Sequence, residues 1–310
     1  MKLGFIIPHY PSEKRVALLP RHMNNFENDI VVEHNFGLNL DIDDEEYEKV
    51  GCTIATREEI FSNCPAIFSL KLILEDDYNY IRPNQMIIGW THPKGSGADF
   101  MKAQSIPKDL IIVDLDNIHP QVYYEDKIKL IDWIKPNFIK DNSFIAGYSA
   151  VLHALLSFGM IPGHNTNVAV LGTGNVSQGA FCAVSKFNNN VRMFYRKTMS
   201  EFIEERGSFD IIINGIEVDK PGTHILSLEN QKGLKKNCLV IDASANAGKS
   251  IEGTEFTSIN NPIYKTNDVY YYVVNNTPSI FYKEASRRIS ESFSKNVYQK
   301  DVKMFQDLVI

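Results

Sequence analysis

Three polar residues in the first third of the chain follow apolar segments that are predicted as strands. They are Arg15 after Leu3–Ile7, Lys71 after Ala66–Leu70 and His92 after Met86–Trp90. In an open α/β sheet, residues at the carboxyl ends of the strands line the ligand crevice. Two cations there suit a small carboxylate substrate, and an imidazole suits proton transfer near neutral pH. The alternative is that Arg15 and Lys71 are exposed loop charges and that His92 is an ordinary turn residue.

A glycine-rich turn connects an apolar segment to a helical pattern in the middle of the chain. Its residues are Gly172, Thr173, Gly174, Asn175, Val176 and Ser177. The first glycine permits a tight turn, the second lets the backbone approach a pyrophosphate, and the helix N-terminus binds the anion. Ser177 stands where the usual fingerprint has a third glycine, and serine is still small enough for close packing of helix on strand. These six residues are predicted to bind a dinucleotide, and a tight turn without a ligand is the alternative.

The end of the next predicted strand indicates which dinucleotide binds. In NAD-binding proteins, an acidic residue about 20 positions downstream hydrogen-bonds the ribose 2′-hydroxyl. Here Val191–Tyr195 is followed by Arg196 and Lys197, and the next acidic residue is Glu201. A guanidinium binds a 2′-phosphate that a carboxylate would repel. The sequence therefore favours NADP(H) over NAD(H), unless Arg196 and Lys197 are only solvated loop charges.

The elements that position these residues alternate along the chain. The predicted strands are Leu3–Ile7, Ile30–Glu33, Ala66–Leu70, Met86–Trp90, Leu110–Asp114, Val168–Leu171, Val191–Tyr195, Asp210–Asn214, Leu239–Ala243 and Val269–Val274. Several are apolar at consecutive positions, as in strands that are covered on both faces of a parallel sheet. Helical patterns lie between them, including Glu45–Val50 and Arg57–Ser62, the second with Thr56 as its N-cap. This alternation predicts an α/β fold with doubly wound sheets.

Two helical segments indicate where the chain divides. Ser143–Phe158 is one long apolar helix pattern that ends at Gly159, and Pro278–Ile310 is helical again. A helix that follows a complete nucleotide-binding fold can pack back on the first domain. We therefore predict two Rossmann-like doubly wound domains with a cleft between them, linked by long helices. Residues 1–140 and 278–310 form the discontinuous substrate domain, and residues 141–277 form the NADP-binding domain.

Composition excludes several classes of protein. The 310 residues include 32 basic and 38 acidic residues, and the net charge of −6 argues against a nucleic-acid partner. No apolar run approaches the roughly 20 residues of a membrane span, and the N-terminus is predicted as a strand and not as a signal peptide. The four cysteines lack the spacing of a zinc site or a disulfide framework. The prediction is a cytoplasmic protein that acts on small molecules and uses no metal.

With these residues in place, the chain resembles the alanine dehydrogenase, transhydrogenase and saccharopine dehydrogenase superfamily over nearly its whole length. The segment Glu13–Pro20 (EKRVALLP) is close to the family's E-x-R-V-A-x-x-P marker, and Lys71 and His92 match its strand-end lysine and its catalytic histidine. The segment Val274–Pro278 (VNNTP), which contains Asn276, is similar to the closing V-A-N-M-P motif. Within the superfamily, the short length and the segments 143–154 and 171–181 are most similar to the enzymes that join pyruvate to ornithine.

The resemblance implies an activity and a set of roles. The reaction is an NADPH-dependent reductive condensation of pyruvate with the side-chain amine of ornithine, or of lysine, to give N5-(carboxyethyl)ornithine. Arg15 and Lys71 are implied to bind the pyruvate carboxylate and to polarise its carbonyl, with His92 as general acid and base. Asn276 is implied to contact the cofactor. Because relatives form dimers, tetramers or hexamers, a homo-oligomer is expected.

Other enzymes of the superfamily remain as alternatives. Asn246 stands where alanine dehydrogenases carry an aspartate, which disfavours the use of free ammonia. A saccharopine-type or alanine dehydrogenase is the first alternative, and a non-catalytic NADPH-binding sensor is the second. A sensor would not need Arg15, Lys71 and His92 together at strand ends. No residue selects ornithine over lysine, and Arg21, Lys94 and Arg287 are the candidates for binding the carboxylate of the amino acid.

Overall fold

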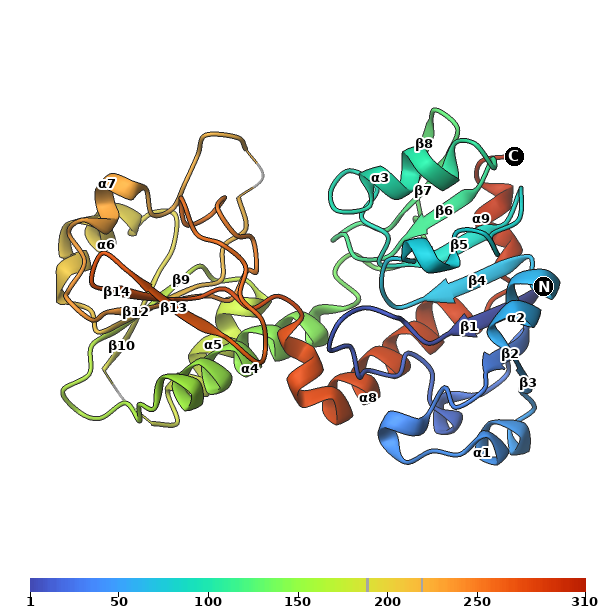
Figure 1. Ribbon diagram of the computed structural model, residues 1–310, viewed down its shortest axis with the longest axis horizontal. Coiled ribbons are helices and arrows are strands. Elements are labelled where there is room, and N and C mark those ends of the chain that lie inside the picture. Colours follow the sequence, from blue (N-terminus) through green and yellow to red (C-terminus); the bar gives the residue numbers. More distant parts are fainter. Residues whose placement is uncertain (188–189, 219) are drawn as a thin grey trace. The chain divides into compact units, whose positions relative to one another are not determined.

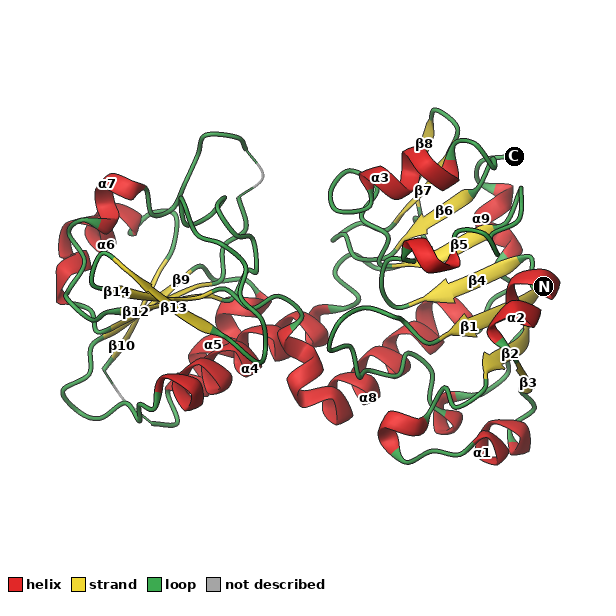
Figure 2. Cartoon of the chain, viewed as in Figure 1, coloured by secondary structure: helices red, strands yellow, loops and turns green. Residues whose placement is uncertain are grey.

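The computed structural model describes residues 1–187, 190–218 and 220–310, and the chain folds into two α/β units (Figure 1). Unit 1 consists of Met1–Ile139 and Tyr282–Ile310, and unit 2 of Lys140–Phe281. The sequence predicted domain boundaries at 140/141 and 277/278, and the two units of the structure divide at 139/140 and 281/282. Each unit is built around one sheet with helices packed against it (Figure 2).

Unit 1 contains an eight-stranded sheet in the order β3-β2-β1-β4-β5-β6-β7-β8. Its strands are β1 (Lys2–Ile6), β2 (Asp29–Glu33), β3 (Thr53–Ala55), β4 (Ala66–Ser69), β5 (Met86–Gly89), β6 (Ile111–Asp114), β7 (Gln121–Tyr124) and β8 (Lys127–Leu130). The pairs from β3 to β6 are parallel, whereas β7 and β8 form an antiparallel edge. The sequence did not predict β3, β7 or β8. β3 has only three residues, and every residue of β8 is exposed, so neither leaves an apolar pattern.

The helices of unit 1 are short except for α8, which has 12 residues. They are α1 (Asp44–Lys49), α2 (Arg57–Asn63), α3 (Ala98–Phe100), α8 (Tyr282–Phe293) and α9 (Lys303–Asp307). The predicted N-cap of α2 is confirmed, because the Thr56 hydroxyl accepts a hydrogen bond from the Glu59 amide and the Glu59 carboxylate accepts one from the Thr56 amide.

The prediction of helix throughout Pro278–Ile310 is wrong between α8 and α9. The helix passes into a π-helical turn at Ser294–Tyr298 and is interrupted before α9. Buried Asn28 explains the interruption: its amide nitrogen donates to the carbonyls of Tyr298 and Lys300, and its oxygen accepts from the Val302 amide. A side chain from the first part of the chain thus takes the place of helical backbone bonds.

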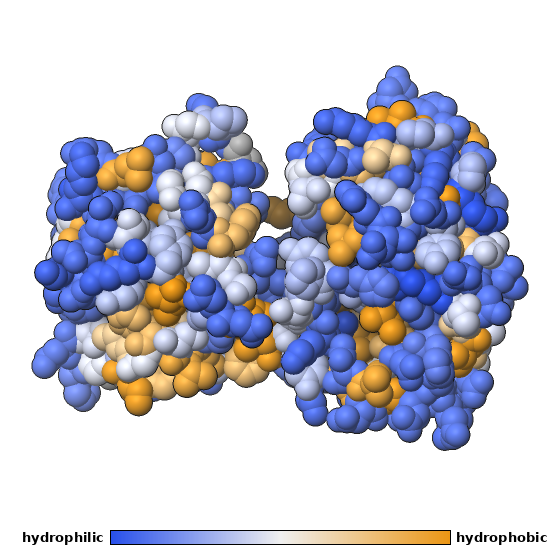
Figure 3. Space-filling view, in the orientation of Figure 1, coloured by the Kyte–Doolittle hydropathy of each residue, from blue (hydrophilic) through white to orange (hydrophobic). Residues whose placement is uncertain are grey.

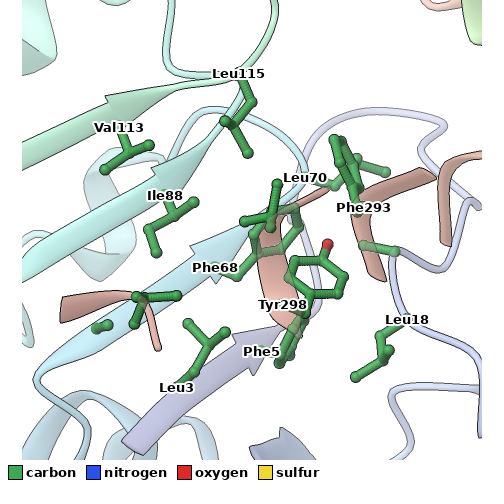
Figure 4. Close-up of a cluster of buried hydrophobic side chains, with 14 of the residues drawn as sticks. Leu3, Phe5, Leu18, Phe68, Leu70, Ile88, Val113, Leu115, Phe293 and Tyr298 are labelled. Carbon is green, nitrogen blue, oxygen red and sulfur yellow. The ribbon is translucent and has the colours of Figure 1, made fainter. Parts of the chain in front are cut away.

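The C-terminal segment completes the core of unit 1 (Figure 4). The ring of Tyr298 lies 4.8 Å from that of Phe5 and 5.1 Å from that of Phe68, and Phe293 lies 5.4 Å from Phe68. All four rings are almost completely buried. Burial of each such side chain contributes roughly 1.5–3 kcal/mol, which explains why a segment so distant in sequence belongs to this unit.

Unit 2 contains a six-stranded sheet in the order β10-β9-β11-β12-β14-β13, parallel except for β13. Its strands are β9 (Val168–Leu171), β10 (Val191–Phe194), β11 (Ile211–Asn214), β12 (Leu239–Asp242), β13 (Ile263–Thr266) and β14 (Val269–Tyr272). Its helices are α4 (Lys140–Phe158), α5 (Asn175–Val184), α6 (Met199–Glu205) and α7 (Leu228–Gln231). Among the described strands of unit 2, the antiparallel edge strand β13 is the one that the sequence did not predict.

Helices α4 and α5 touch through two glycines. A Cβ atom on Gly147 of α4 would lie 1.8 Å from the carbonyl oxygen of Val176, and one on Gly179 of α5 would lie 1.9 Å from that of Phe144. Only glycine allows this separation of the helices. Leu156 of α4 is 81% exposed, and Ile161, just after this helix, is 83% exposed. Figure 3 shows hydrophobic side chains gathered on the lower part of unit 2, over the region of α4 and α5.

Candidate active site

The topology of unit 1 gathers the predicted catalytic residues at one edge of its sheet. Strand order reverses between β1 and β4, and in open α/β sheets ligands bind at such a switch point, beyond the carboxyl ends of the strands. Arg15 follows β1 and Lys71 follows β4, on either side of this point. His92 follows β5, the next parallel strand.

The indole of Trp90 lies beneath both cations. The guanidinium carbon of Arg15 is 4.8 Å from the ring centroid of Trp90, and the ammonium nitrogen of Lys71 is 5.3 Å from it. The Lys71 ammonium also lies 5.1 Å from the ring of Tyr10. Such cation–π contacts contribute about 0.5–2 kcal/mol each. Trp90 therefore positions both cations. This residue was not identified from the sequence, although it immediately precedes Thr91 and His92.

Glu13 holds the guanidinium of Arg15 in place. The Nε and Nη2 atoms of Arg15 donate to the two carboxylate oxygens of Glu13 over 2.9 and 2.6 Å. Burial would raise the pKa of the Glu13 carboxyl, but the charge and hydrogen bonds of Arg15 lower it from 4.5 to about 2. Glu13 is therefore ionised at neutral pH, and it keeps a buried arginine charged and oriented.

Lys71 is the cation whose charge is most sensitive to its surroundings. Burial, together with the neighbouring charge of Arg15, lowers the pKa of Lys71 from 10.5 to about 8, although Glu13 and Asp116 oppose the decrease. Its ammonium is protonated at neutral pH. An anion bound beside it would favour this protonated form further. The pair Arg15 and Lys71 can thus bind a carboxylate and stabilise negative charge on an adjacent carbonyl oxygen.

His92 lies in a constrained loop beside an acidic residue. Its φ angle of +44° is in the left-handed region, which is uncommon for residues other than glycine. The Nε2 atom of His92 lies 3.1 Å from an Oδ2 atom of Asp116, which follows β6. Both side chains are about one-third exposed. An imidazole that a carboxylate partner orients is suited to proton transfer.

The glycine-rich turn of unit 2 also lies at a switch point, here between β9 and β11. Gly172 has a φ of +100°, and a Cβ atom on it would lie 2.6 Å from the Ser177 hydroxyl. A Cβ atom on Gly215, which follows β11, would lie 2.3 Å from the same hydroxyl. The Ser177 hydroxyl donates to the Leu171 carbonyl over 2.9 Å. Serine fits the third position of the fingerprint because these two glycines make room for it.

The groups that suit a dinucleotide surround this turn. Gly174 is the N-cap residue of α5, a Cβ atom there would meet nothing within 4 Å, and no described side chain caps the helix. Thr173 is exposed, whereas Asn175 and Val176 are half-buried in the first turn of α5. Arg196 and Lys197 are exposed after β10, the strand beside β9, and neither has a hydrogen bond or ion pair with the described residues. Open amide groups and two available cations fit a pyrophosphate and a 2′-phosphate.

Two strands of unit 2 end in a polar network that the sequence did not reveal. The buried amide of Asn214 donates to Asp242 over 3.0 Å, and the Ser244 hydroxyl donates to the same Asp242 oxygen over 2.6 Å. Burial raises the pKa of Asp242, against the hydrogen bonds from Ser244 and Asn214. The sequence feature that could have indicated this network is the polar residue at the end of each of the apolar strands β11 and β12. This network supports the loop that carries Asn246, whose side-chain amide is 3.5 Å from the Val218 carbonyl.

The remaining predicted residues are placed as follows. Asn276 lies after β14 with a φ of +60°, and its carbonyl accepts a hydrogen bond from the Ser279 amide. Of the three candidates for the amino-acid carboxylate, Arg287 pairs with Glu284 over 2.5 Å, and Lys94 lies 5.8 Å from the ring of Tyr123. Arg21 lines a surface groove of unit 1.

No group of three or more His, Cys, Asp or Glu residues within the described ranges could hold a metal ion. The same residues include no helix that is long and apolar enough to cross a membrane. Two doubly wound sheets, with a glycine-rich strand-to-helix turn at the switch point of the second, are typical of NAD(P)-dependent dehydrogenases.

Comparisons with known proteins specify the family. Residues 9–121 match the N-terminal domain model of alanine dehydrogenase/PNT, and residues 146–307 match the corresponding C-terminal domain model. The chain is 59% identical to a Clostridium botulinum protein and 52% identical to a Lactococcus lactis protein, both named N(5)-(carboxyethyl)ornithine synthase; each comparison covers 100% of this chain and 98% of the relative. It is 25% identical to alanine dehydrogenase 1 of Staphylococcus aureus over 86% of the chain and 78% of that protein. The chain therefore belongs to the alanine dehydrogenase/PNT family, in the branch of the N(5)-(carboxyethyl)ornithine synthases.

Solved structures agree on the fold. An L-alanine dehydrogenase superposes with a TM-score of 0.77 at 16% identity, covering 96% of this chain and 89% of that one. A transhydrogenase from Sinorhizobium meliloti superposes with a TM-score of 0.75 at 19% identity, covering 95% and 92%. The predicted two-domain, Rossmann-like α/β fold is thus confirmed.

Proposed function

We propose that this enzyme condenses pyruvate with the side-chain amine of ornithine and reduces the resulting imine with NADPH, giving N5-(carboxyethyl)ornithine. The observation that carries the proposal is the position of Arg15 and Lys71 over one indole ring, with His92 after the neighbouring strand. The names of the relatives that are 52–59% identical over the full chain support it.

Arg15 and Lys71 bind and activate the 2-oxo acid. Arg15, which Glu13 holds by two hydrogen bonds, anchors the carboxylate of pyruvate. Lys71 also binds the carboxylate, and its ammonium stabilises the negative charge that develops on the carbonyl oxygen when the amine attacks. Lys71 must be protonated to bind the carboxylate and to stabilise the charge on the carbonyl oxygen. Its pKa of about 8 means that it is protonated at neutral pH.

His92 transfers the protons that the condensation requires. Attack of the amine on the pyruvate carbonyl gives a carbinolamine, and loss of its hydroxyl as water needs a proton donor. An imidazole can donate that proton through one ring nitrogen and can take one from the attacking amine. NADPH, when bound, supplies the hydride that reduces the imine.

The cofactor residues lie in unit 2. The amides of Gly172, Gly174 and the first turn of α5 are suited to the pyrophosphate, and Arg196 with Lys197 is suited to the 2′-phosphate. Asn276, in the closing motif, is assigned to the nicotinamide end. The comparisons specify only a nicotinamide cofactor, and the exposed side chain of Arg196 is what favours NADP(H) over NAD(H).

The proposal also includes the roles of the two units, the location of the enzyme and its oligomeric state. Unit 1 is the substrate domain and unit 2 the cofactor domain. The enzyme works in the cytoplasm as a homo-oligomer, for which the exposed apolar side of α4 offers a surface.

An assay of substrate pairs tests the reaction. NADPH oxidation is measured with pyruvate alone and with pyruvate plus ornithine, lysine, alanine, glutamate or ammonia. We expect rapid oxidation only with a diamino acid, and faster oxidation with ornithine than with lysine. Equal rates with ammonia would favour an alanine dehydrogenase. Equal rates with 2-oxoglutarate and lysine in place of pyruvate and ornithine would favour a saccharopine-type enzyme. NADPH binding without turnover would favour a sensor.

A further inference from the structure

We infer that Ser286, in helix α8, is the positioning residue of Arg15, so that the C-terminal part of the chain sets the affinity of the enzyme for its 2-oxo acid. The inference rests on the proposed role of Arg15 in binding the substrate carboxylate. It extends that role to a residue that lies outside the sequence motifs and on a different element of unit 1.

The segment that carries Arg15 has buried backbone without regular secondary structure. Residues 7–19, all of which the structure describes, form no helix or strand. The side chains of Val16–Leu19 are nevertheless almost completely buried. A buried backbone amide without a hydrogen-bond partner is costly, so the amides of this segment need acceptors from another element.

Helix α8 provides two of these acceptors. The Ser286 hydroxyl accepts a hydrogen bond from the Val16 amide over 2.8 Å, and the Ser290 hydroxyl accepts one from the Leu19 amide over 2.8 Å. Both serines are completely buried, on the same side of α8 as Ile289 and Phe293. A hydroxyl in such a place is favourable only when it is hydrogen-bonded. The two serines therefore match the amides of the segment that carries Arg15.

A third contact extends this arrangement to the residue before Arg15. The ammonium nitrogen of Lys14 lies 5.7 Å from the ring centroid of Tyr282, the first residue of α8. Residues that are four positions apart lie on the same face of a helix, so Tyr282, Ser286 and Ser290 form one line along α8. The segment Lys14–Leu19 follows this line.

Ser286 acts on Arg15 through the peptide group that joins Arg15 to Val16. The amide that binds the Ser286 hydroxyl belongs to this peptide group. The peptide group on the other side is held too, because the Arg15 amide donates to the Glu13 carboxylate over 2.9 Å. With both peptide groups fixed, the direction of the Arg15 side chain is fixed as well. Its guanidinium carbon then lies 4.8 Å from the ring centroid of Trp90.

Ser290 is a matched control, because it has the same burial and the same bond length on the same helix. Its hydroxyl also lies 2.8 Å from Nδ1 of His22. Each serine stabilises the fold by satisfying a buried amide, but Ser290 holds a peptide group three residues further from Arg15. A loss of stability alone should therefore be common to both serines, whereas an effect on the substrate site should be specific to Ser286.

Ser286→Ala removes the acceptor and leaves the Val16 amide unpaired. We expect KM for pyruvate to rise about 3- to 10-fold, the effect of one lost hydrogen bond, with kcat changed less than about twofold. KM for NADPH should not change. Ser290→Ala should lower the melting temperature by a similar amount and change KM for pyruvate less than about twofold. Ser286→Cys, whose thiol is a weaker acceptor of similar shape, should give an intermediate KM.

Arg15→Lys separates this inference from the proposed function, because it keeps a cation beside Glu13 but lacks the guanidinium fork. It should raise KM for pyruvate more than Ser286→Ala does. An unchanged KM in Ser286→Ala beside a raised KM in Arg15→Lys would overturn the inference and leave the proposed function intact. Equal increases in Ser286→Ala and Ser290→Ala would also overturn it, because the cause would then be a general loosening of the segment. An unchanged KM in both Arg15→Lys and Ser286→Ala would overturn the inference together with the anchoring role of Arg15.

Discussion

Glu13 and Arg15 form an ion pair in which both side chains are almost completely buried. Their closest atoms are 2.6 Å apart, and the exposed fractions are 1% for Arg15 and 0% for Glu13. A buried guanidinium without a partner would be costly, and the carboxylate two residues earlier removes that cost. In the proposed function, Arg15 binds the substrate carboxylate, and Glu13 is the group that keeps this arginine charged and oriented.

Glu13→Gln should destabilise unit 1 in a pH-dependent way. Because the folded-state pKa of Glu13 is about 2, below its ordinary value of 4.5, ionised Glu13 stabilises the fold above pH 4.5, and this contribution is lost as the pH falls towards 2. At pH 7 the variant should lose about 3–5 kcal/mol, as for a broken buried pair. Urea unfolding of both proteins measures the difference, which should shrink below about pH 4.5. A difference that is constant with pH would show that the lost stability comes from packing.

Pyruvate binding should weaken as Lys71 loses its proton. Since the pKa of Lys71 is about 8 and the protonated form binds the carboxylate, KM for pyruvate should rise about tenfold per pH unit above that value. Steady-state kinetics at saturating NADPH and ornithine measures this. In Lys71→Arg the charge is permanent, so KM should not depend on pH over this range, whatever the effect on kcat. The same rise in Lys71→Arg would assign the titration to another group.

Arg196→Ala should weaken NADPH binding about 10- to 100-fold and leave NADH binding unchanged, because only NADPH carries the 2′-phosphate. Fluorescence titration with both cofactors measures the two Kd values. Arg192→Ala is the matched control: it removes an arginine of the same strand region that already pairs with Glu205 and lies 4.7 Å from the ring of Phe194. An equal loss for both cofactors in Arg196→Ala would mean that this residue does not distinguish them.

Gly147→Ala should destabilise unit 2, because its new Cβ would lie 1.8 Å from a backbone carbonyl and would force α4 and α5 apart. Overpacking of this kind costs about 1–3 kcal/mol. Gly163→Ala, where a Cβ would meet nothing within 4 Å, provides the control and should change stability by less than about 1 kcal/mol. Thermal unfolding of the two variants compares the effects. Equal melting temperatures would contradict the close helix contact.

Much of the fold could be predicted because its strands are buried on both faces. Segments such as Val168–Leu171 and Met86–Gly89 are apolar throughout, and their predicted bounds agree with the structure to within a residue. Two edge strands, β8 and β13, could not be found, since β8 has no buried residue and β13 has only half-buried and exposed ones. The break between α8 and α9 depends on Asn28, which lies far away in sequence and gives no local signal.

The site was predictable only in part, for a similar reason. Arg15, Lys71 and His92 could be found because each follows an apolar strand, and parallel strands bring their carboxyl ends together. Trp90 and Asp114 were hidden because they look like the ends of apolar segments. Their functions depend on which strands are neighbours, as when Asp114 of β6 binds the amides after β5. Sequence spacing gives no information about that pairing.

The most direct test of the proposed reaction follows one hydrogen into the product. The enzyme is given pyruvate, ornithine and ammonia together, with NADPH deuterated at the transferred position, and the products are analysed by mass spectrometry and NMR. The account predicts N5-(carboxyethyl)ornithine with one deuterium on the carbon that was the carbonyl of pyruvate, and no labelled alanine. Labelled alanine as the main product, with no secondary amine, would contradict it.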